Sequence, residues 1–391
     1  MSPTIAVVGA SLAGLTAARA LRDQSYDGRI VVIGDEVHAP YDRPPLSKDF
    51  LAGTASLDDI ALGTPDDADL GLEWRLGTAA VGLDRSSRSV LLDDGSGIRA
   101  DGVVLATGAR ARRLAGSDGL AGVHVLRSLD DAISLREDLA SAGRLVVIGA
   151  GFIGAEVAST ARTLGLEVTV VEAQPVPLAG PLGADMGAAC AALHADHGTR
   201  LLLGTGVAGL VGTDRVEAVE LTDGTRLPAD VVVVGIGAAP TIEWLAHSGV
   251  ALGNGVLTDA RQATNIPGVV AVGDCAATWS TSAERHVRIE HWTNALEQPA
   301  TAAATLLGAG ERPAPSPVPY FWSDQYGARI QFAGSRREGD VARVVEGSCA
   351  SRSFVTVYER DGRPVAVLGM NQPRLFTRLR RQLRSTVPAT A

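Results

Sequence analysis

The sequence is poor in cysteine and has no paired cysteine motif. Its three cysteines are Cys190, Cys275 and Cys349, and no two of them form a CxxC or another close pair. A disulfide framework needs an even set of cysteines, and a redox dithiol needs two that lie close together. We therefore expect neither, and we expect no metal site.

A basic surplus and a long apolar run are also missing. The formal net charge is −9, whereas nucleic-acid-binding proteins usually carry a basic surplus on one face. No stretch reaches the roughly 20 apolar residues that a helix needs to cross a bilayer. Met1 leads into an apolar strand without a basic leader. We expect a cytoplasmic protein that binds neither nucleic acid nor membranes.

The length of the chain predicts more than one domain. At 391 residues it exceeds what one compact core usually holds, and typical domain sizes predict two or three domains. The 45 glycines and 46% hydrophobic residues are ordinary for an α/β enzyme, because βα turns and phosphate loops use glycine. The expected class is α/β.

A dinucleotide-binding pattern opens the chain. An apolar strand at residues 4–8 is followed by Gly9-Ala-Ser-Leu-Ala-Gly14, an alanine-rich helical segment and a second strand that ends before Asp35 and Glu36. The glycines allow the backbone to approach a pyrophosphate at the helix N-terminus, and the acids can bond ribose hydroxyls. Ser11 stands where a second glycine is expected, so a tight turn without a nucleotide remains an alternative.

The pattern recurs in the middle of the chain. A strand at residues 145–148 leads into Gly149-Ala-Gly151-Phe-Ile-Gly154, a complete GxGxxG, and a later strand ends at Glu172. One such unit binds one dinucleotide, so two predict FAD together with a nicotinamide nucleotide. The Glu172 carboxylate would bond a free 2′-hydroxyl and repel a 2′-phosphate, which favours NADH. The alternative is that Glu172 only caps a surface strand.

The segments between and after these units also carry residues that could contact a flavin. Residues 41–48 read Tyr-Asp-Arg-Pro-Pro-Leu-Ser-Lys, and the two prolines can fix Arg43 and Lys48 beside a flavin, where a cation stabilises negative charge. A solvated loop is the alternative. Three further apolar strands end at Thr107-Gly108, at Gly235-Ile-Gly237 and at Gly273-Asp274, and the Asp274 carboxylate could bond the ribityl chain of a flavin.

The order of these motifs resembles the pyridine nucleotide–disulfide oxidoreductase superfamily and, within it, the ferredoxin reductases that serve bacterial oxygenases. The resemblance covers essentially the whole chain and rests on Pro44-Pro-Leu-Ser-Lys48, Gly273-Asp274 and Arg288-Ile-Glu-His-Trp-Thr-Asn-Ala-Leu-Glu-Gln298. It implies two Rossmann-like dinucleotide-binding domains plus a small α+β C-terminal domain. The expected domains are 1–108 with 238–312 for FAD, 109–237 for NAD, and 313–391.

The resemblance also implies roles for individual residues. Those expected to contact FAD are Gly9, Ser11, Ala13, Gly14, Asp35, Glu36, Arg43, Lys48, Ala80, Thr107, Gly108, Arg127, Asp274, Glu290, His291 and Trp292. Those expected to contact NADH are Gly149, Gly151, Phe152, Ile153, Gly154, Glu156, Glu172 and Gly237. Lys48, Glu156 and Trp292 are the expected catalytic residues, in the sense of positioning, although Glu156 could instead be a helix-surface carboxylate.

The absent cysteines narrow the reaction that this resemblance implies. Disulfide-reducing relatives need two cysteines in the first helix of the FAD domain, and no cysteine precedes Cys190. Direct transfer from flavin to acceptor remains: a hydride from NADH to FAD, then single electrons to a small iron–sulfur ferredoxin that feeds a haem or Rieske oxygenase. The alternatives are an NADH-dependent reductase of quinones, dyes or oxygen, and an NADH-sensing flavoprotein.

The composition and the hydrophobic pattern of the sequence change in the C-terminal part. Aromatic residues between Tyr320 and Tyr326 are followed by alternating strands at 342–345, 354–358 and 365–368, with an Asp-Gly hairpin signal. A basic amphipathic helix then follows. Its apolar positions are Leu375, Phe376, Leu379 and Leu383, and its arginines are Arg374, Arg378, Arg380, Arg381 and Arg384. This helix either packs as an ordinary terminal helix or steers an acidic ferredoxin toward a flavin edge near Trp322 and Tyr326.

Overall fold

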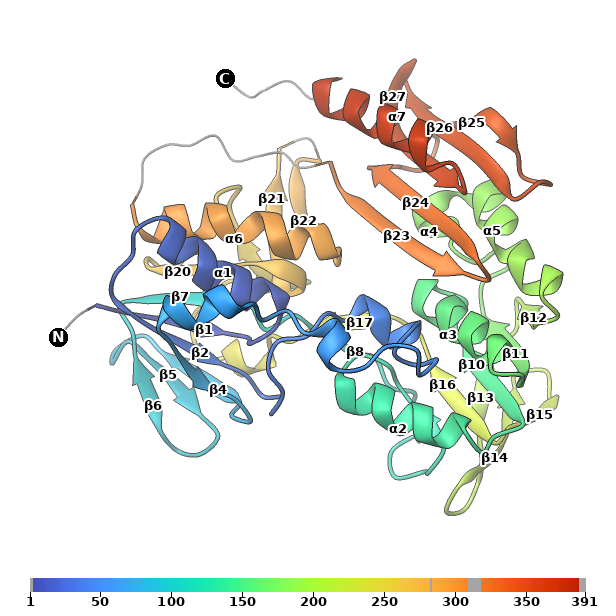
Figure 1. Cartoon of the computed structure of the whole chain (residues 1–391), viewed down its shortest axis with the longest axis horizontal. Helices are drawn as coiled ribbons and strands as arrows, with labels where there is room; N and C mark the ends of the chain where they lie inside the picture. The colour runs from blue at the N-terminus through green and yellow to red at the C-terminus, as the bar shows by residue number, and fades with distance from the viewer. Residues whose placement is uncertain (1–2, 282, 309–317, 387–391) are drawn as a thin grey trace.

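The computed structural model describes residues 3–281, 283–308 and 318–386, with side chains up to Leu383. Two units built on parallel sheets lie side by side, and a C-terminal sheet lies against the second of them (Figure 1). The expected domain boundary at 312/313 falls outside the described residues, as does the side chain of Arg384. The predicted fold class, two dinucleotide-binding folds plus a C-terminal antiparallel sheet, is confirmed.

The first unit is a five-stranded parallel sheet in the order β20-β7-β1-β2-β3. Its strands are β1 Thr4–Val8, β2 Arg29–Ile33, β3 Leu72–Arg75, β7 Gly102–Leu105 and β20 Val269–Ala271. Strand β1 is buried along its whole length, as expected for the centre of a parallel sheet covered on both faces. Helices α1 (Leu12–Asp23) and α6 (Trp292–Leu306) pack on one face of this sheet (Figure 1).

The second unit repeats this arrangement in the order β12-β11-β10-β16-β9, again all parallel. Its strands are β9 Val123–His124, β10 Arg144–Ile148, β11 Glu167–Glu172, β12 Arg200–Leu203 and β16 Val231–Val234. Helices α2 (Leu129–Leu139) and α3 (Phe152–Thr163) contribute to the core on one face. The two predicted strand–glycine turn–helix–strand units are therefore both present.

A two-stranded ribbon joins the units. The chain leaves the first unit through β8 (Ala109–Ala111) and returns through β17 (Ala238–Pro240), and the two strands pair antiparallel with Ala109 opposite Pro240. The ribbon lies between the two units (Figure 1). The remaining strands of both units are β4 Ala80–Asp84, β5 Ser89–Leu92, β6 Gly97–Arg99, β13 Val207–Gly212, β14 Val216–Leu221, β15 Arg226–Pro228, β18 Leu252–Gly253, β19 Gly255–Thr258, β21 Ala276–Ser280 and β22 Arg285–Arg288. The short 3-10 helices are Pro44–Ser47, Asp58–Ile60, Pro65–Leu70, Glu243–Leu245 and Gly273–Cys275.

The C-terminal sheet is antiparallel in the order β23-β24-β27-β26-β25. Its strands are β23 Tyr320–Gln325, β24 Ala328–Gly334, β25 Val341–Ser348, β26 Ser353–Arg360 and β27 Arg363–Met370. Helix α7 (Pro373–Thr386) covers one face through Phe376 and Leu383. The other face packs on α4 (Ala179–Leu182) and α5 (Ala184–Asp196) of the second unit. This packing fixes the C-terminal domain against the second unit.

The described helices and cysteines add neither a membrane span nor a disulfide to this fold. Among the described helices, none is long and apolar enough to cross a membrane. All three cysteines are free, and Cys190 and Cys275 are buried. Burial raises the pKa of the Cys190 thiol to about 12, so it stays protonated at neutral pH.

Candidate functional site

Two glycines in each unit are required by close backbone contacts. Gly9 has a φ of +121°, and a Cβ there would lie 2.1 Å from the Ala106 carbonyl oxygen. In the second unit Gly149 has a φ of +101°, and its Cβ would lie 2.4 Å from the Gly235 oxygen. Both turns therefore need glycine for conformation and for space.

The last glycine of each motif lies behind the turn. A Cβ at Gly14 would come within 1.8 Å of the Gly9 oxygen, and a Cβ at Gly154 within 2.2 Å of the Gly149 oxygen. Each helix can therefore pack closely on its strand. Ser11, by contrast, is extended with a φ of −111°, a conformation that any residue adopts, so serine is compatible with the turn.

One cavity of about 1100 Å³ connects the two units and the C-terminal sheet. It is larger than most ligand pockets, which measure roughly 300–1,000 Å³. The residues expected at the site that line it are Gly9, Ser11, Ala13, Asp35, Glu36, Arg43, Lys48, Ala80, Thr107, Gly108, Arg127, Gly151, Phe152, Ile153, Glu156, Gly237, Asp274, Glu290, His291 and Trp292. A single space thus brings together residues that are more than 280 positions apart in the sequence.

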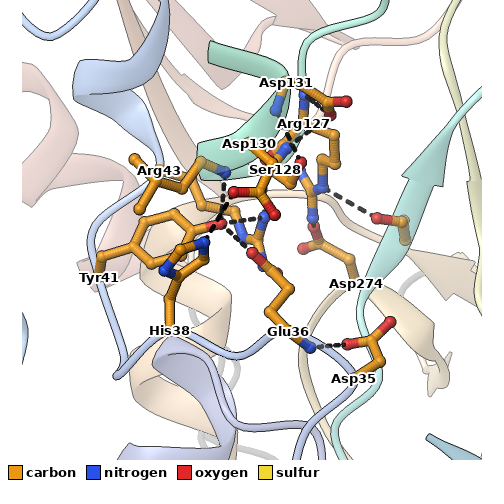
Figure 2. Close-up of polar contacts among 12 residues, drawn as sticks. Asp35, Glu36, His38, Tyr41, Arg43, Arg127, Ser128, Asp130, Asp131 and Asp274 are labelled. Atoms are coloured by element: carbon orange, nitrogen blue, oxygen red, sulfur yellow. Dashed lines mark hydrogen bonds and ion pairs between the residues drawn. The ribbon is translucent and has the colours of Figure 1, made fainter. Parts of the chain in front are cut away.

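A chain of charged groups from both units runs along the cavity (Figure 2). Arg43 Nη2 lies 2.6 Å from Glu36 Oε1, and Tyr41 donates a short hydrogen bond to Glu36 Oε2. Arg43 Nη1 also donates to the Arg127 carbonyl oxygen at 2.7 Å. Arg127 Nη2 in turn lies 2.7 Å from Asp274 Oδ2. The charges of the expected FAD residues are therefore largely paired with one another.

The Lys48–Glu156 ion pair closes the cavity where the two units meet. Lys48 follows the 3-10 helix formed by the two prolines, and its Nζ lies 2.6 Å from Glu156 Oε2 and 2.9 Å from the Pro44 oxygen. Glu156 lies on α3 and is only 5% exposed. The alternative of a helix-surface carboxylate is therefore wrong, because the side chain points inward and accepts hydrogen bonds.

An aromatic cluster forms the wall nearest the C-terminal sheet. Trp292 begins α6, its Nε1 donates to Asp42 Oδ1 at 2.8 Å, and its ring meets Trp322 edge-on with centroids 5.8 Å apart. Trp322 in turn stacks on Tyr320 at 5.9 Å. The ring of His291 lies 5.1 Å from that of Phe321. Flat rings from β23 and from the start of α6 thus face one cavity.

Three nitrogen atoms of residues that line the cavity lack a hydrogen-bond partner in the described part of the chain. Trp244 Nε1, Arg288 Nε and His291 Nδ1 are buried and have no hydrogen-bond partner among the described residues, and all three residues line the cavity. Buried polar groups are rarely left unpaired, because this costs about 1–3 kcal/mol each. Burial lowers the pKa of His291 to about 4, so its imidazole is neutral at neutral pH. The size of the cavity and the close backbone approach at Gly9 fit FAD.

Glu172 lies beside the second glycine turn. Its Oε2 accepts a hydrogen bond from the Ala150 amide at 2.9 Å, and its Oε1 accepts one from the Gln174 amide at 2.9 Å. The carboxylate is therefore fixed against the turn rather than free at the strand end. This geometry suits a side chain that reads the ribose of a dinucleotide bound at that turn.

Tyr326 is not at the cavity. The turn after β23, where Tyr326 has a φ of +51°, carries it into the second unit. There its hydroxyl lies 2.9 Å from His194 Nδ1 and 2.9 Å from Thr199 Oγ1, and its ring stacks on His197. The expectation that Tyr326 lies with Trp322 at the flavin edge is therefore wrong, because the two residues point to different units.

Sequence reasoning missed several residues of this site. Trp244, Phe321 and Tyr41 line the cavity, and Ser323 donates to Glu156 Oε1 at 2.6 Å. None belongs to a glycine motif. The one sequence signal for Ser323 is that it directly follows Trp322 in the aromatic segment.

Comparison with known proteins assigns a family. The family described as pyridine nucleotide-disulphide oxidoreductase matches residues 3–299, and a family described as reductase C-terminal matches residues 320–391. The chain is 40% identical over 379 residues to the ferredoxin reductase component of chlorobenzene dioxygenase from a Cupriavidus strain, covering 96% of this chain and 91% of that protein. It is also 40% identical to the ferredoxin–NAD(+) reductase component of the biphenyl dioxygenase system of Paraburkholderia xenovorans, covering 100% of this chain and 95% of that protein.

A solved structure agrees over nearly the whole chain. The chain superposes on the reductase in the crystal structure of the covalent putidaredoxin reductase–putidaredoxin complex with a TM-score of 0.93. The two sequences are 36% identical, and the match covers 99% of this chain and 94% of that chain. The match includes both dinucleotide-binding folds and the C-terminal sheet.

Proposed function

Since the chain belongs to the pyridine nucleotide–disulphide oxidoreductase family, we propose that it is an FAD-dependent NADH:ferredoxin reductase. It oxidises NADH and reduces a small iron–sulfur ferredoxin, which in turn serves an oxygenase of the haem or Rieske type. The observation that carries this proposal is the single cavity that joins the first glycine turn, the second glycine turn and the aromatic wall of the C-terminal sheet. Electron transfer from NADH through FAD to a protein acceptor needs the two nucleotide sites to adjoin, and residues of both turns line this one space.

Most residues expected from the sequence keep their roles in this proposal. FAD is held by Gly9, Ser11, Ala13, Gly14, Asp35, Glu36, Arg43, Lys48, Ala80, Thr107, Gly108, Asp274, Glu290, His291 and Trp292 of the first unit and by Arg127 of the second, to which we add Trp244. The residues for NADH are Gly151, Phe152, Ile153, Glu156 and Gly237, which line the cavity, and Gly149, Gly154 and Glu172, which belong to the glycine turn and its neighbourhood and do not line it. Residues 1–108 with 238–312, 109–237 and 313–391 are the corresponding domains.

The residues of the chain prepare the site for charge. FAD, when bound, supplies the chemistry that converts a two-electron donor into a source of single electrons. Lys48 holds positive charge at the cavity and is kept in place by Glu156 and Pro44. His291 stays neutral, and Trp292 and Phe321 exclude water from one wall. We propose that the protein works in the cytoplasm, in keeping with its free cysteines.

The test uses the purified FAD-loaded protein, which is first reduced with NADH and then reoxidised by different electron acceptors. NADH should reduce the bound FAD, and a ferredoxin from an oxygenase system should reoxidise it faster than oxygen or a small quinone does. Faster reoxidation by quinones or oxygen would instead identify a reductase of small acceptors. Slow reduction by NADH with a change in sedimentation would identify an NADH-sensing flavoprotein.

Replacing Glu172 with alanine is expected to weaken the preference for NADH over NADPH. The carboxylate repels a 2′-phosphate and can bond a 2′-hydroxyl. Losing both effects should reduce the ratio of kcat/KM for NADH to that for NADPH by about 100-fold, or about 1.4 kcal/mol for each of two tenfold factors. The measurement is ferricyanide reduction with each coenzyme.

The Glu172→Gln variant is the matched control for this substitution. The amide loses the charge but retains an oxygen that can accept the Ala150 N–H bond. It should therefore lose the phosphate repulsion while keeping the turn intact, and its ratio should fall between those of the wild type and the alanine variant. An unchanged ratio in both variants would show that Glu172 does not read the ribose.

Reversing the charge of Arg378 and Arg381 is expected to slow electron transfer to an acidic ferredoxin. Both side chains are exposed on α7, on a protein of net charge −9. The neighbouring Arg380 lies over the ring of Tyr320, which stacks on Trp322 at the cavity. Double replacement by glutamate should lower kcat/KM for the ferredoxin about tenfold at low salt, because steering depends on charge.

Two further assays decide whether this effect is one of docking. Ferricyanide reduction should be unchanged, and the loss should shrink as salt is added. Glutamate at Arg99 and Arg226, two exposed arginines of the other units, makes the same change in net charge and should have little effect. Equal losses with ferredoxin and ferricyanide would contradict a docking role for α7.

A further inference from the structure

The Glu156 carboxylate is held by groups from all three parts of the molecule. Its Oε2 accepts from Ser47 Oγ at 2.5 Å and from Lys48 Nζ at 2.6 Å, both of the first unit. Its Oε1 accepts from Ser323 Oγ at 2.6 Å. Glu156 itself belongs to α3 of the second unit, and Ser323 belongs to β23 of the C-terminal sheet. The carboxylate is thus the point where the three parts meet.

The Ser323 hydroxyl has only one orientation open to it. Ser323 is fully buried at 0% exposure, and Gln325 Nε2 donates to its Oγ at 3.0 Å. Gln325 is also buried, at 2%. Since Ser323 accepts from the amide, its single proton is left for Glu156 Oε1. The C-terminal sheet therefore presents one directed donor to a buried carboxylate.

Strand β23 could have supported Glu156 by packing alone. The hydrogen bond from Ser323 also fixes the orientation of the Glu156 carboxylate. Without Ser323, Oε1 would be a buried charged oxygen without that donor, while Oε2 would still be bound to Lys48. Hydrogen bonds to charged groups are roughly twice as strong as those between neutral groups. A carboxylate anchored at one oxygen can rotate, and the ammonium of Lys48 then keeps only the Pro44 carbonyl oxygen as a fixed partner.

We propose that Ser323 is a positioning residue: it fixes the Glu156 carboxylate and, through it, the Lys48 ammonium at the cavity. The site for electron transfer is therefore completed by the C-terminal domain. The inference rests on the proposed function in one respect: the rate measurement takes NADH as the reductant. Ser323 itself does not line the cavity, so it acts through Glu156 rather than on a bound molecule.

The test compares Ser323→Ala with Ser159→Ala in the FAD-loaded full chain. Ser159 is also on α3, and its Oγ accepts from the Tyr326 amide at 2.6 Å. Its loss removes a hydrogen bond between the same helix and the same hairpin without touching Glu156. Ser323→Cys, which preserves most of the side-chain volume and weakens the donor, serves if the alanine variant folds poorly.

Stopped-flow reduction by NADH should separate positioning from binding. In Ser323→Ala the limiting rate of FAD reduction should fall about tenfold while the NADH concentration at half-maximal rate changes less than twofold. In Ser159→Ala both quantities should match the wild type. Equal losses in the two variants would overturn the proposal, because they would indicate a general effect of weakening this contact.

The reduction potential of bound FAD gives a readout that does not use NADH. Without the Ser323 donor, the negative charge of Glu156 is less well compensated. Because reduced FAD carries more negative charge than oxidised FAD, the affinity for reduced FAD should fall more than the affinity for oxidised FAD. A threefold change in the ratio of the two affinities corresponds to a shift of about 14 mV to more negative potential for a two-electron couple. Titration with dithionite and a reference dye measures it even if NADH proves not to be the donor.

A double substitution checks the route of the effect. In a Glu156→Ala background the carboxylate is gone, so adding Ser323→Ala should change the rate and the potential by less than twofold. Such non-additivity is expected of residues that act as one unit. A full additional effect of Ser323→Ala in that background, or a wild-type potential in Ser323→Ala alone, would refute a role through Glu156.

Discussion

Replacing Gly9 with alanine is expected to yield a protein that no longer retains FAD. The new Cβ would lie 2.1 Å from the Ala106 carbonyl oxygen, at a φ of +121°. Real Cβ atoms do not approach a backbone oxygen this closely, so the turn or the end of β7 must move. We expect bound FAD to fall to less than about a tenth of the wild-type content, since we propose that this turn forms the pyrophosphate site. The ratio of flavin to protein absorbance measures it.

The corresponding change in the second unit should impair the use of NADH and leave the binding of FAD intact. In Gly149→Ala the Cβ would lie 2.4 Å from the Gly235 oxygen, so this protein should retain FAD but fail to be reduced by NADH, while dithionite still reduces it. Gly53→Ala controls for backbone strain alone, because Gly53 has a φ of +76° and open space around its Cβ. It should cost about 1 kcal/mol of stability and leave both functions intact. Loss of the same cofactor in Gly9→Ala and Gly149→Ala would disprove the assignment of the two turns.

Replacing Lys48 with methionine should slow the reduction of FAD by NADH about 100-fold. Methionine keeps the unbranched stem and removes the charge, so the effect reports the ammonium near the reacting groups. A positive charge at this point is worth about 2.7 kcal/mol if it accounts for two tenfold factors. Stopped-flow absorbance of the flavin measures the rate, and a rate within threefold of the wild type would rule out this role.

The same variant leaves the Glu156 carboxylate buried with only its two serine donors, Ser47 and Ser323. Removing one partner of a buried ion pair typically costs about 3–5 kcal/mol. The double variant Lys48→Met with Glu156→Gln has no uncompensated charge and should unfold at higher temperature than Lys48→Met alone. Its FAD reduction should remain slow. Identical unfolding temperatures would show that the pair does not contribute to stability in the way its burial suggests.

The parts of the fold that sequence predicts well are those determined by local patterns. The strands at 4–8 and 145–148 were expected from β-branched runs and appear as β1 and β10. Their turns were expected from glycines, and the contacts of Gly9 and Gly149 give the physical reason. The hairpin and the basic helix near the C-terminus were likewise expected from alternation and helical spacing, and they are β26, β27 and α7.

Contacts between distant segments could not be read in the same way. Ser323 and Glu156 are separated by 167 positions, and their hydrogen bond depends on how the C-terminal sheet packs on α3. Tyr326 belongs to the same strand and turn as Trp322, yet one residue enters the second unit and the other faces the cavity. Trp244 lies outside every motif. Such assignments need the tertiary structure because no local pattern specifies them.

The paired ribbon of β8 and β17 has a consequence for how this protein can change over evolutionary time. Because Ala109 lies opposite Pro240, the two ends of the inserted half meet, and closing the first half around it costs little chain entropy. The coenzyme-binding half is thus an insertion whose two ends meet, but the ribbon is not its only attachment. Its core includes side chains of the first half, namely Tyr41, Leu46, Phe50, Leu51 and Ile60, and its α4 and α5 pack on the C-terminal sheet. A half with a different donor preference would have to preserve both of these contact surfaces in order to fit the flavin-binding scaffold.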